Sequence, residues 1–198
     1  RNFGWVDYLV SGEADALVGP LCRTLVQQGH LSQPYPAGLL APIHRLQGYP
    51  ANSRATFNDL ESLPYPDFTD YFQQLEAGRL APGIRDGLPL ETSRGCWWGA
   101  KHHCTFCGLN GGGMAFRRKS PQRALDEIEW LARRWNIHDL EVVDNILDLR
   151  YLDTVVPHLA ASPQDWNLFY EVKSNLRPEQ MKAMADAGIR ALQPGIES

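Results

Sequence analysis

The distribution of apolar residues predicts that strands and helices alternate in the second half of the chain. The short apolar runs that predict strands are 88–92, 140–143, 168–172 and 191–196. Between them, apolar residues recur at helical spacing in three segments, which are 121–135, 149–159 and 178–188. Strands that alternate with helices favour parallel pairing with right-handed crossovers. We therefore predict an α/β fold, and four such strands make about half of a closed eight-stranded barrel.

The helices carry local signals of their own. Ser120 is a capping residue, and Pro121 suits the first helical position. Gly188 is expected to end the third helix. The side chains expected to face the core are Leu125, Ile128, Leu131, Ala132 and Trp135 in the first helix, and Met181, Met184 and Ala185 in the third.

The first part of the chain has a different pattern. Residues 6–10 predict a strand, and a helix is expected from Asp15 to Gln28. Seven of the fourteen prolines then lie between Pro34 and Pro82, which disfavours long helices there. We predict a first domain remnant at 1–28, a Pro-rich interdomain linker at 29–87 and a barrel domain at 88–198. The aromatic residues of 63–72 are expected to pack on that barrel.

Composition limits the class of protein. A net charge of −4 and a pI near 5.9 argue against a nucleic-acid binder. No run of about 18 apolar residues predicts a membrane span, and there is no signal peptide. Unpaired cysteines fit a reducing, cytoplasmic location. Because the sequence starts at Arg1 and stops after an apolar run at Ser198, we expect a truncated, inactive fragment of a longer protein.

Three of the four cysteines form one motif. Cys96, Cys104 and Cys107 follow the pattern Cys-x7-Cys-x2-Cys directly after a predicted strand. Three thiolates can hold three irons of a four-iron cluster and leave the fourth iron open to a small molecule. The remaining Cys22 is expected to be a buried small hydrophobe rather than a ligand.

These residues carry a resemblance to a known family. The run Leu90–Trp98 followed by Lys101–Asn110 is similar to the cobalamin-dependent radical S-adenosylmethionine (radical SAM) enzymes that modify ribosomally made peptides. The usual radical SAM spacing is three residues and then two, whereas the first gap here is seven. The strand and helix within 1–28, with Gly12-Glu13 after the strand, resemble the end of a Rossmann-like cobalamin-binding domain.

The resemblance implies a partial (β/α) barrel of radical SAM type, a [4Fe-4S] cluster, S-adenosylmethionine (SAM) and cobalamin, with the cobalamin site mostly outside this chain. In such barrels the active site lies at the carboxyl ends of the strands. Asp144 or its neighbouring carbonyls would accept from the amine of SAM. Ser174, Asn175 or Lys173 would donate to its carboxylate, and Glu171 or Glu197 would accept from the ribose hydroxyls. The residues expected in the cofactor pocket are Phe106, Asp144, Asn145, Glu171, Lys173, Ser174 and Glu197.

The implied activity is C-methylation of a leader-bearing precursor peptide after reductive cleavage of SAM. The electron would come from a reductant protein such as flavodoxin or ferredoxin. A radical cyclisation or epimerisation is the alternative outcome. A different class of function remains open at this stage, namely a structural zinc module or electron carrier in which His102 or His103 is a ligand. Arg117-Arg118-Lys119 is expected to form a solvated basic face.

Overall fold

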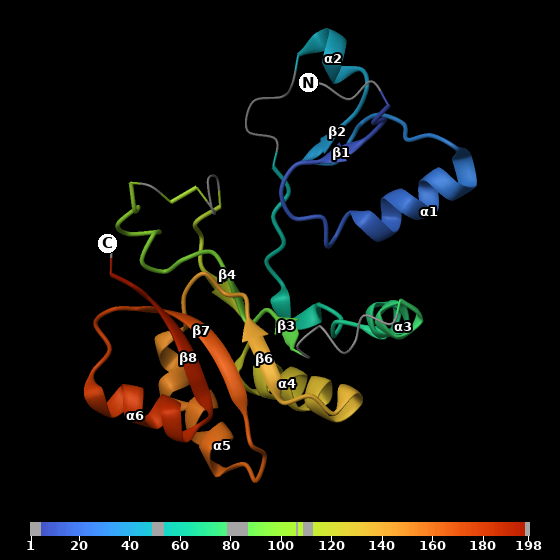
Figure 1. Cartoon of the computed structure of the whole chain (residues 1–198). Coiled ribbons are helices and arrows are strands. Elements are labelled where there is room, and N and C mark those ends of the chain that lie inside the picture. The colour runs from blue at the N-terminus through green and yellow to red at the C-terminus, as the bar shows by residue number, and fades with distance from the viewer. Residues whose placement is uncertain (1–4, 49–53, 79–86, 106, 109–112, 197–198) are drawn as a thin grey trace. The chain divides into compact units, whose positions relative to one another are not determined.

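The computed structural model describes residues 5–48, 54–78, 87–105, 107–108 and 113–196. The chain divides into two compact units, 1–59 and 60–198, which are considered separately (Figure 1). The division falls inside the segment that the sequence predicts as a linker. None of the helices in the described residues is long and apolar enough to cross a membrane.

The first unit contains a two-stranded antiparallel ladder and two helices. Leu9 pairs with Leu40 and Val10 with Leu39, so part of the predicted linker contributes a strand here. The predicted helix begins at Val18 rather than Asp15, which puts Pro20 in the first turn, where no backbone N–H is needed. Cys22 is exposed, so its predicted burial is wrong. The elements of this unit are β1 (Leu9–Val10), α1 (Val18–Gln28), β2 (Leu39–Leu40) and α2 (His44–Gln47).

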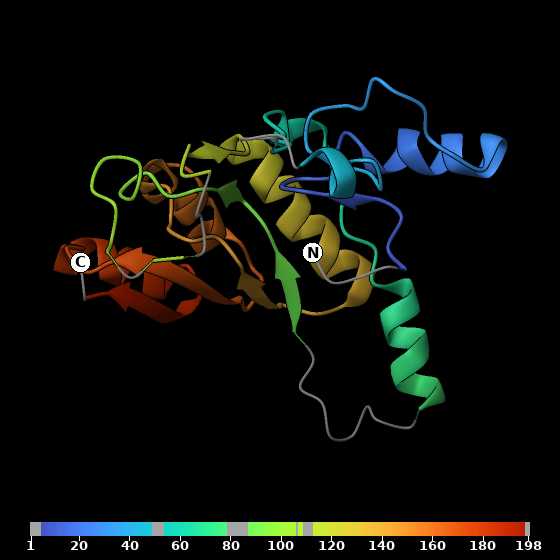
Figure 2. The same ribbon diagram turned by 90° about the horizontal axis from the view of Figure 1, so that it is seen from above.

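The second unit is built on a parallel four-stranded sheet in the order β3-β6-β7-β8. Helices α4, α5 and α6 lie together on one face of this sheet (Figures 1 and 2). Each of β6, β7 and β8 pairs with the strand of this sheet that precedes it in the chain, as expected for successive strand–helix repeats. The bounds are β3 (Leu88–Leu90), α4 (Pro121–Trp135), β6 (Asp139–Val142), α5 (Val155–Ala161), β7 (Asn167–Lys173), α6 (Pro178–Asp186) and β8 (Ile189–Gly195).

Five shorter elements also lie in the described residues of this unit. A 3₁₀ turn and α3 precede the sheet, a short ladder of two strands follows β3, and a second 3₁₀ turn precedes α5. Their bounds are η1 (Leu60–Ser62), α3 (Thr69–Ala77), β4 (Ser93–Arg94), β5 (Arg117–Arg118) and η3 (Leu149–Asp153).

The core lies between the sheet and its helices. Alternate residues of β7 are buried, as period-two geometry requires when one face is covered. The predicted face of α4 is confirmed, because Leu125, Ile128, Leu131 and Ala132 are all buried. In α6 only Met184 is buried as predicted. Met181 and Ala185 are exposed, and Ala183 and Ala187 take the inward positions instead.

Two boundaries differ from the sequence prediction for identifiable reasons. The segment 149–159 is a 3₁₀ turn followed by α5, not one helix. Pro157 explains the break, since it has no N–H to donate to Asp153 and its ring would clash with that carbonyl. Strand β8 begins at Ile189, directly after Gly188. Gly188 has φ +79°, and an added Cβ would lie 2.4 Å from the Trp166 carbonyl oxygen.

The aromatic residues before the sheet pack on α4 as predicted. The ring centroids of Tyr65 and Trp130 are 5.1 Å apart, and those of Phe72 and Trp135 are 4.8 Å apart. Phe68 also meets Trp135 edge-on. Tyr71 is the exception, because its side chain is exposed.

Candidate active site at the carboxyl ends of the strands

The carboxyl ends of the four parallel strands meet at one edge of the sheet. The register pairs Leu90 with Val142 and Lys173 with Gly195, so β3 ends level with β6 and β7 ends level with β8, while β7 continues to Lys173 beyond Phe169, the partner of Glu141. The backbone N–H of Val143 also donates to the Leu90 carbonyl at 2.9 Å. Among the described residues, the polar sets that follow β3, β6 and β7 in the chain therefore come at this edge, whereas the fourth set, Glu197 and Ser198, falls outside the described residues.

The cysteine loop begins and ends at this edge. Strands β4 and β5 pair antiparallel and close the base of the loop. Gly95 adopts φ +80°, and a Cβ there would lie 2.4 Å from the Ala115 carbonyl oxygen, so only glycine fits. The Cys96 N–H donates to the Met114 carbonyl at 3.3 Å. The backbone at Cys96 is therefore held in place by the paired strands at the base of the loop.

The three thiols are free and half-buried. The Gly99 N–H lies 3.2 Å from Cys96 Sγ, and the Cys107 N–H donates to the Cys104 carbonyl. Within the described residues, no three His, Cys, Asp or Glu side chains are gathered closely enough to hold a metal ion. The donor chemistry suits an iron–sulfur cluster, because three thiols share one loop and one of them already accepts an N–H. The ligand set itself stays a prediction.

Two tryptophans attach the loop to the strand ends. The Trp97 Nε1–H donates to the Leu147 carbonyl at 2.9 Å, and the Leu147 N–H donates to the Glu171 carbonyl at 2.8 Å. The Lys173 ammonium lies 3.6 Å from the centroid of the Trp98 ring. His102 lies on that same ring, with centroids 4.5 Å apart. The loop is therefore linked to the segments that follow β6 and to the end of β7.

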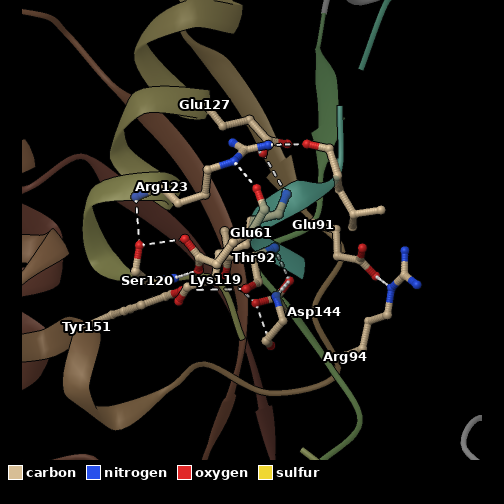
Figure 3. Close-up of polar contacts among 12 residues, drawn as sticks. Glu61, Glu91, Thr92, Arg94, Lys119, Ser120, Arg123, Glu127, Asp144 and Tyr151 are labelled. Atoms are coloured by element: carbon tan, nitrogen blue, oxygen red, sulfur yellow. Dashed lines mark hydrogen bonds and ion pairs between the residues drawn. The ribbon is translucent and has the colours of Figure 1, made fainter. Parts of the chain in front are cut away.

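Asp144 lies at the predicted edge and is completely buried. Its Oδ1 accepts the N–H groups of Thr92 at 2.7 Å and Ser93 at 2.9 Å. Its Oδ2 accepts the Ser93 hydroxyl at 2.8 Å and the Thr92 hydroxyl (Figure 3). Burial raises the pKa of Asp144 to about 6, although these four hydrogen bonds oppose the shift. Its predicted contact with SAM stays a prediction.

The other predicted pocket residues divide into two groups. Glu171, Lys173 and Asn145 are half-buried at the carboxyl edge, and Ser174 is exposed just beyond β7. Phe106 and Glu197 fall outside the described residues.

Sequence reasoning missed a layer of buried polar residues beneath the loop. The Tyr151 hydroxyl donates to the Lys119 carbonyl at 2.8 Å, and the Lys119 N–H donates to the Thr92 carbonyl at 2.9 Å. Burial, reinforced by the nearby Asp144 charge, raises the pKa of Tyr151 and of Tyr170 above their ordinary value. The one available signal was the pair of hydroxyl residues Thr92-Ser93 directly after an apolar strand.

The predicted basic face at 117–119 is wrong for Lys119. Its side chain is only 2% exposed, and its ammonium lies 2.6 Å from Glu127 Oε2 (Figure 3). Arg123 shares that carboxylate at 2.6 Å and also donates to the Leu63 carbonyl at 2.7 Å. Arg118 pairs with Asp148 at 2.6 Å. These contacts join the loop base, α4 and the segment before α3.

A separate hollow of about 430 Å³ lies near the amino-terminal ends of the strands. Its lining includes Gly87, Asp139 and Asn167, and the Asn167 amide donates to Asp139 Oδ2 at 3.0 Å. Since Asp139 and Asn167 begin β6 and β7, this hollow is distinct from the edge that carries the cysteine loop.

Comparisons with known proteins give a result for the fold only. No protein-family model and no curated protein sequence matches the chain. Among solved structures, the cobalamin-dependent S-adenosylmethionine radical enzyme OxsB with aqua-cobalamin and S-adenosylmethionine bound is similar, with a TM-score of 0.68 and 17% identity. Its apo, selenomethionine-labelled form gives 0.63 and 18%. Each match covers 96% of this chain but 28% of that enzyme. This chain therefore shares its fold with a part of OxsB that is less than a third of its length.

Proposed function

We propose that this chain belongs to a radical SAM enzyme and carries its cluster-binding loop. The observation that supports this most directly is the position of the Cys96–Cys107 loop. It leaves a two-stranded base at the carboxyl edge of a parallel sheet, where enzymes with this strand–helix architecture bind their substrates. The similarity in fold to a cobalamin-dependent radical SAM enzyme agrees with this assignment.

In this proposal Cys96, Cys104 and Cys107 hold a [4Fe-4S] cluster whose fourth iron binds SAM. When bound, the cluster supplies the electron that cleaves SAM reductively. The chain's own residues bind and orient. The Lys173 ammonium at the end of β7 lies over the Trp98 ring of the loop, and the backbone carbonyl of Glu171 accepts the N–H of Leu147, so both residues belong to the part of β7 that is linked to the loop. Glu171 and Lys173 are suited to the ribose hydroxyls and the carboxylate of SAM respectively, with Asn145 and Ser174 as further donors.

The finer proposal is cobalamin-dependent C-methylation of a ribosomally made precursor peptide in the cytoplasm, with a flavodoxin or ferredoxin as electron donor. The domain assignment is the end of a cobalamin-binding domain at 1–28, a linker at 29–87 and the start of the partial barrel at 88–198. Support comes from the resemblance of 90–110 to that subgroup and from the cobalamin and SAM named for OxsB.

The assignment of the cluster is tested by anaerobic reconstitution with iron and sulfide. The chain should bind four irons, and a longer form that carries the rest of the barrel should, with dithionite and SAM, release 5′-deoxyadenosine and methionine. Alanine at any of Cys96, Cys104 or Cys107 should remove both properties. Cys22→Ala is the matched control, because this cysteine is exposed in the other unit and should not affect iron content. A triple alanine variant that still bound four irons would refute the ligand assignment.

The methylation is tested separately, so that its failure leaves the cluster assignment standing. A longer form of the protein, which carries this chain together with the cobalamin-binding domain and the rest of the barrel, is reconstituted, supplied with cobalamin and with SAM labelled on the methyl group, and incubated with a library of synthetic peptides. Mass spectrometry should show the labelled methyl group on a peptide carbon. Cleavage of SAM with a cyclised or epimerised peptide would instead support the alternative radical outcome.

A further inference from the structure

We infer that Asp144 is a positioning residue that fixes the start of the cysteine loop and does not itself contact SAM. The inference rests on the proposed function and deepens it. It replaces the role that the sequence suggested for this residue, an acceptor for the amine of SAM, with a role exerted through Thr92 and Ser93.

The carboxylate of Asp144 is occupied by hydrogen bonds from within the chain. An ionised carboxylate offers about four acceptor positions. Asp144 uses four, and all of the donors belong to Thr92 and Ser93. The side chain is fully buried beneath these two residues. A ligand amine would have to displace one of these donors in order to reach either oxygen.

The two donor residues lie shortly before the cysteine motif in the chain. Thr92 follows β3, and Ser93 begins β4, three residues before Cys96. On its other side, Thr92 is held by the Lys119 N–H at its carbonyl. Asp144 therefore completes a set of contacts that grips the chain where it leaves the sheet, which sets the direction in which Cys96 emerges.

A positioning role of Asp144 and a direct contact with SAM differ in their tolerance of an amide at this position. In Asp144→Asn, Oδ1 still accepts both N–H groups, and the new amide N–H₂ can donate to the two hydroxyls, which rotate to accept. Asp144→Ala loses all four contacts. A positioning role is therefore preserved by Asn and lost with Ala. A direct contact of the SAM amine with Oδ2 is lost with both, because the amide N–H₂ that replaces Oδ2 cannot accept a hydrogen bond and Oδ1 already accepts two N–H groups.

The experiment compares the wild-type chain with Asp144→Asn, Asp144→Ala and the double variant Thr92→Val/Ser93→Ala. The double variant removes the two hydroxyl donors but keeps the carboxylate and both N–H donors, so it stays informative if Asp144→Ala does not fold. The readouts are iron retained against a chelator and the electron paramagnetic resonance (EPR) spectrum of the reduced cluster with and without SAM. Hydrogen exchange at 93–96 is measured in the chain without iron.

With Asp144→Asn we expect wild-type iron retention and a wild-type spectral response to SAM. With Asp144→Ala we expect iron affinity to fall about 10-fold or more, as for other groups that orient metal ligands. Exchange at 93–96 should rise about 10-fold or more. The double variant should lie between the wild type and Asp144→Ala.

Two results would overturn the inference. One is an Asp144→Asn variant that keeps its iron but no longer responds to SAM, which would indicate direct contact. The other is an Asp144→Ala variant with wild-type exchange at 93–96. If the wild type binds no iron, the proposed function fails, but the exchange measurement still decides whether Asp144 holds the loop.

Discussion

The buried carboxyl of Asp144 predicts a specific dependence of stability on pH. Its pKa is raised from 3.8 to about 6 in the folded chain, chiefly because burial disfavours the charged form. Between these two values the folded state binds more protons at this site than the unfolded state does. Stability must therefore fall as the pH rises through this window. Below the pKa of Asp144 in the unfolded state, its side chain is protonated and carries no desolvation penalty. Above its pKa in the folded state, the side chain is ionised and the folded state carries the full penalty.

The magnitude follows from the size of the shift. Roughly two pKa units at about 1.4 kcal/mol each give a limiting penalty of about 3 kcal/mol, most of which develops between about pH 4 and about pH 7. Asp144→Asn carries no charge to desolvate, yet it can keep the contacts with Thr92 and Ser93. The free energy of unfolding of the wild type, relative to this variant, should therefore decrease by about 3 kcal/mol across that range.

Urea denaturation of both proteins, followed by tryptophan fluorescence at a series of pH values, measures this difference directly. Asp126→Asn is the matched control for the substitution itself, because Asp126 is exposed on α4. If the wild type and Asp144→Asn showed the same pH dependence, Asp144 would not be the desolvated carboxyl that the structure describes, and the reasoning would fail.

Three further predictions test other parts of the second unit. Glu127→Gln leaves the buried Lys119 ammonium without its charge partner and should cost about 3 kcal/mol or more in urea denaturation, while adding Lys119→Met should recover part of the loss. Gly188→Ala combines a left-handed backbone with a Cβ 2.4 Å from a carbonyl oxygen, so it should lower the melting temperature more than Asn136→Ala, which changes only a left-handed position at the end of α4. Lys173→Met removes the cation over Trp98, a contact worth about 1 kcal/mol, so thiol reagents should modify the loop cysteines about fivefold faster; an unchanged rate would show that this contact does not hold the loop.

The fold could be predicted from the sequence where structure depends on local pattern. The period-two and helical-period runs located the four parallel strands and their three covering helices, and Ser120-Pro121 marked the start of α4 correctly. Boundaries failed where a single residue overrides the pattern. Pro157 divides the apolar run 149–159, and the turn at Gly188 allows β8 to start two residues earlier than expected.

The candidate site was predictable at the level of its edge, and less so at the level of individual side chains. Parallel strands put their carboxyl ends together, so the cysteine loop and Lys173 could be placed at one edge without any structure. The partners of a side chain are a different matter. Trp98 under the Lys173 ammonium and the Leu147 carbonyl that accepts from Trp97 depend on how a long loop folds back, and no local pattern encodes that.

Charged residues show most clearly where sequence reasoning stops. Lys119 and Asp144 both follow short strands, where polar residues are usually solvated, and both are buried. The groups that make their burial possible lie elsewhere in the chain: Thr92 is 52 positions before Asp144, and Glu127 lies on the following helix. Burying a charge is costly unless such partners are present. Whether Lys119 and Asp144 are buried therefore depends on residues elsewhere in the chain, and their own sequence neighbours do not reveal it. Both sets of contacts meet at the base of the cysteine loop, where the Lys119 N–H and the Asp144 carboxylate hold Thr92 from opposite sides. The burial of charge is thus concentrated at the base of the cysteine loop, where β4 and β5 pair and the backbone leaves and rejoins the sheet domain.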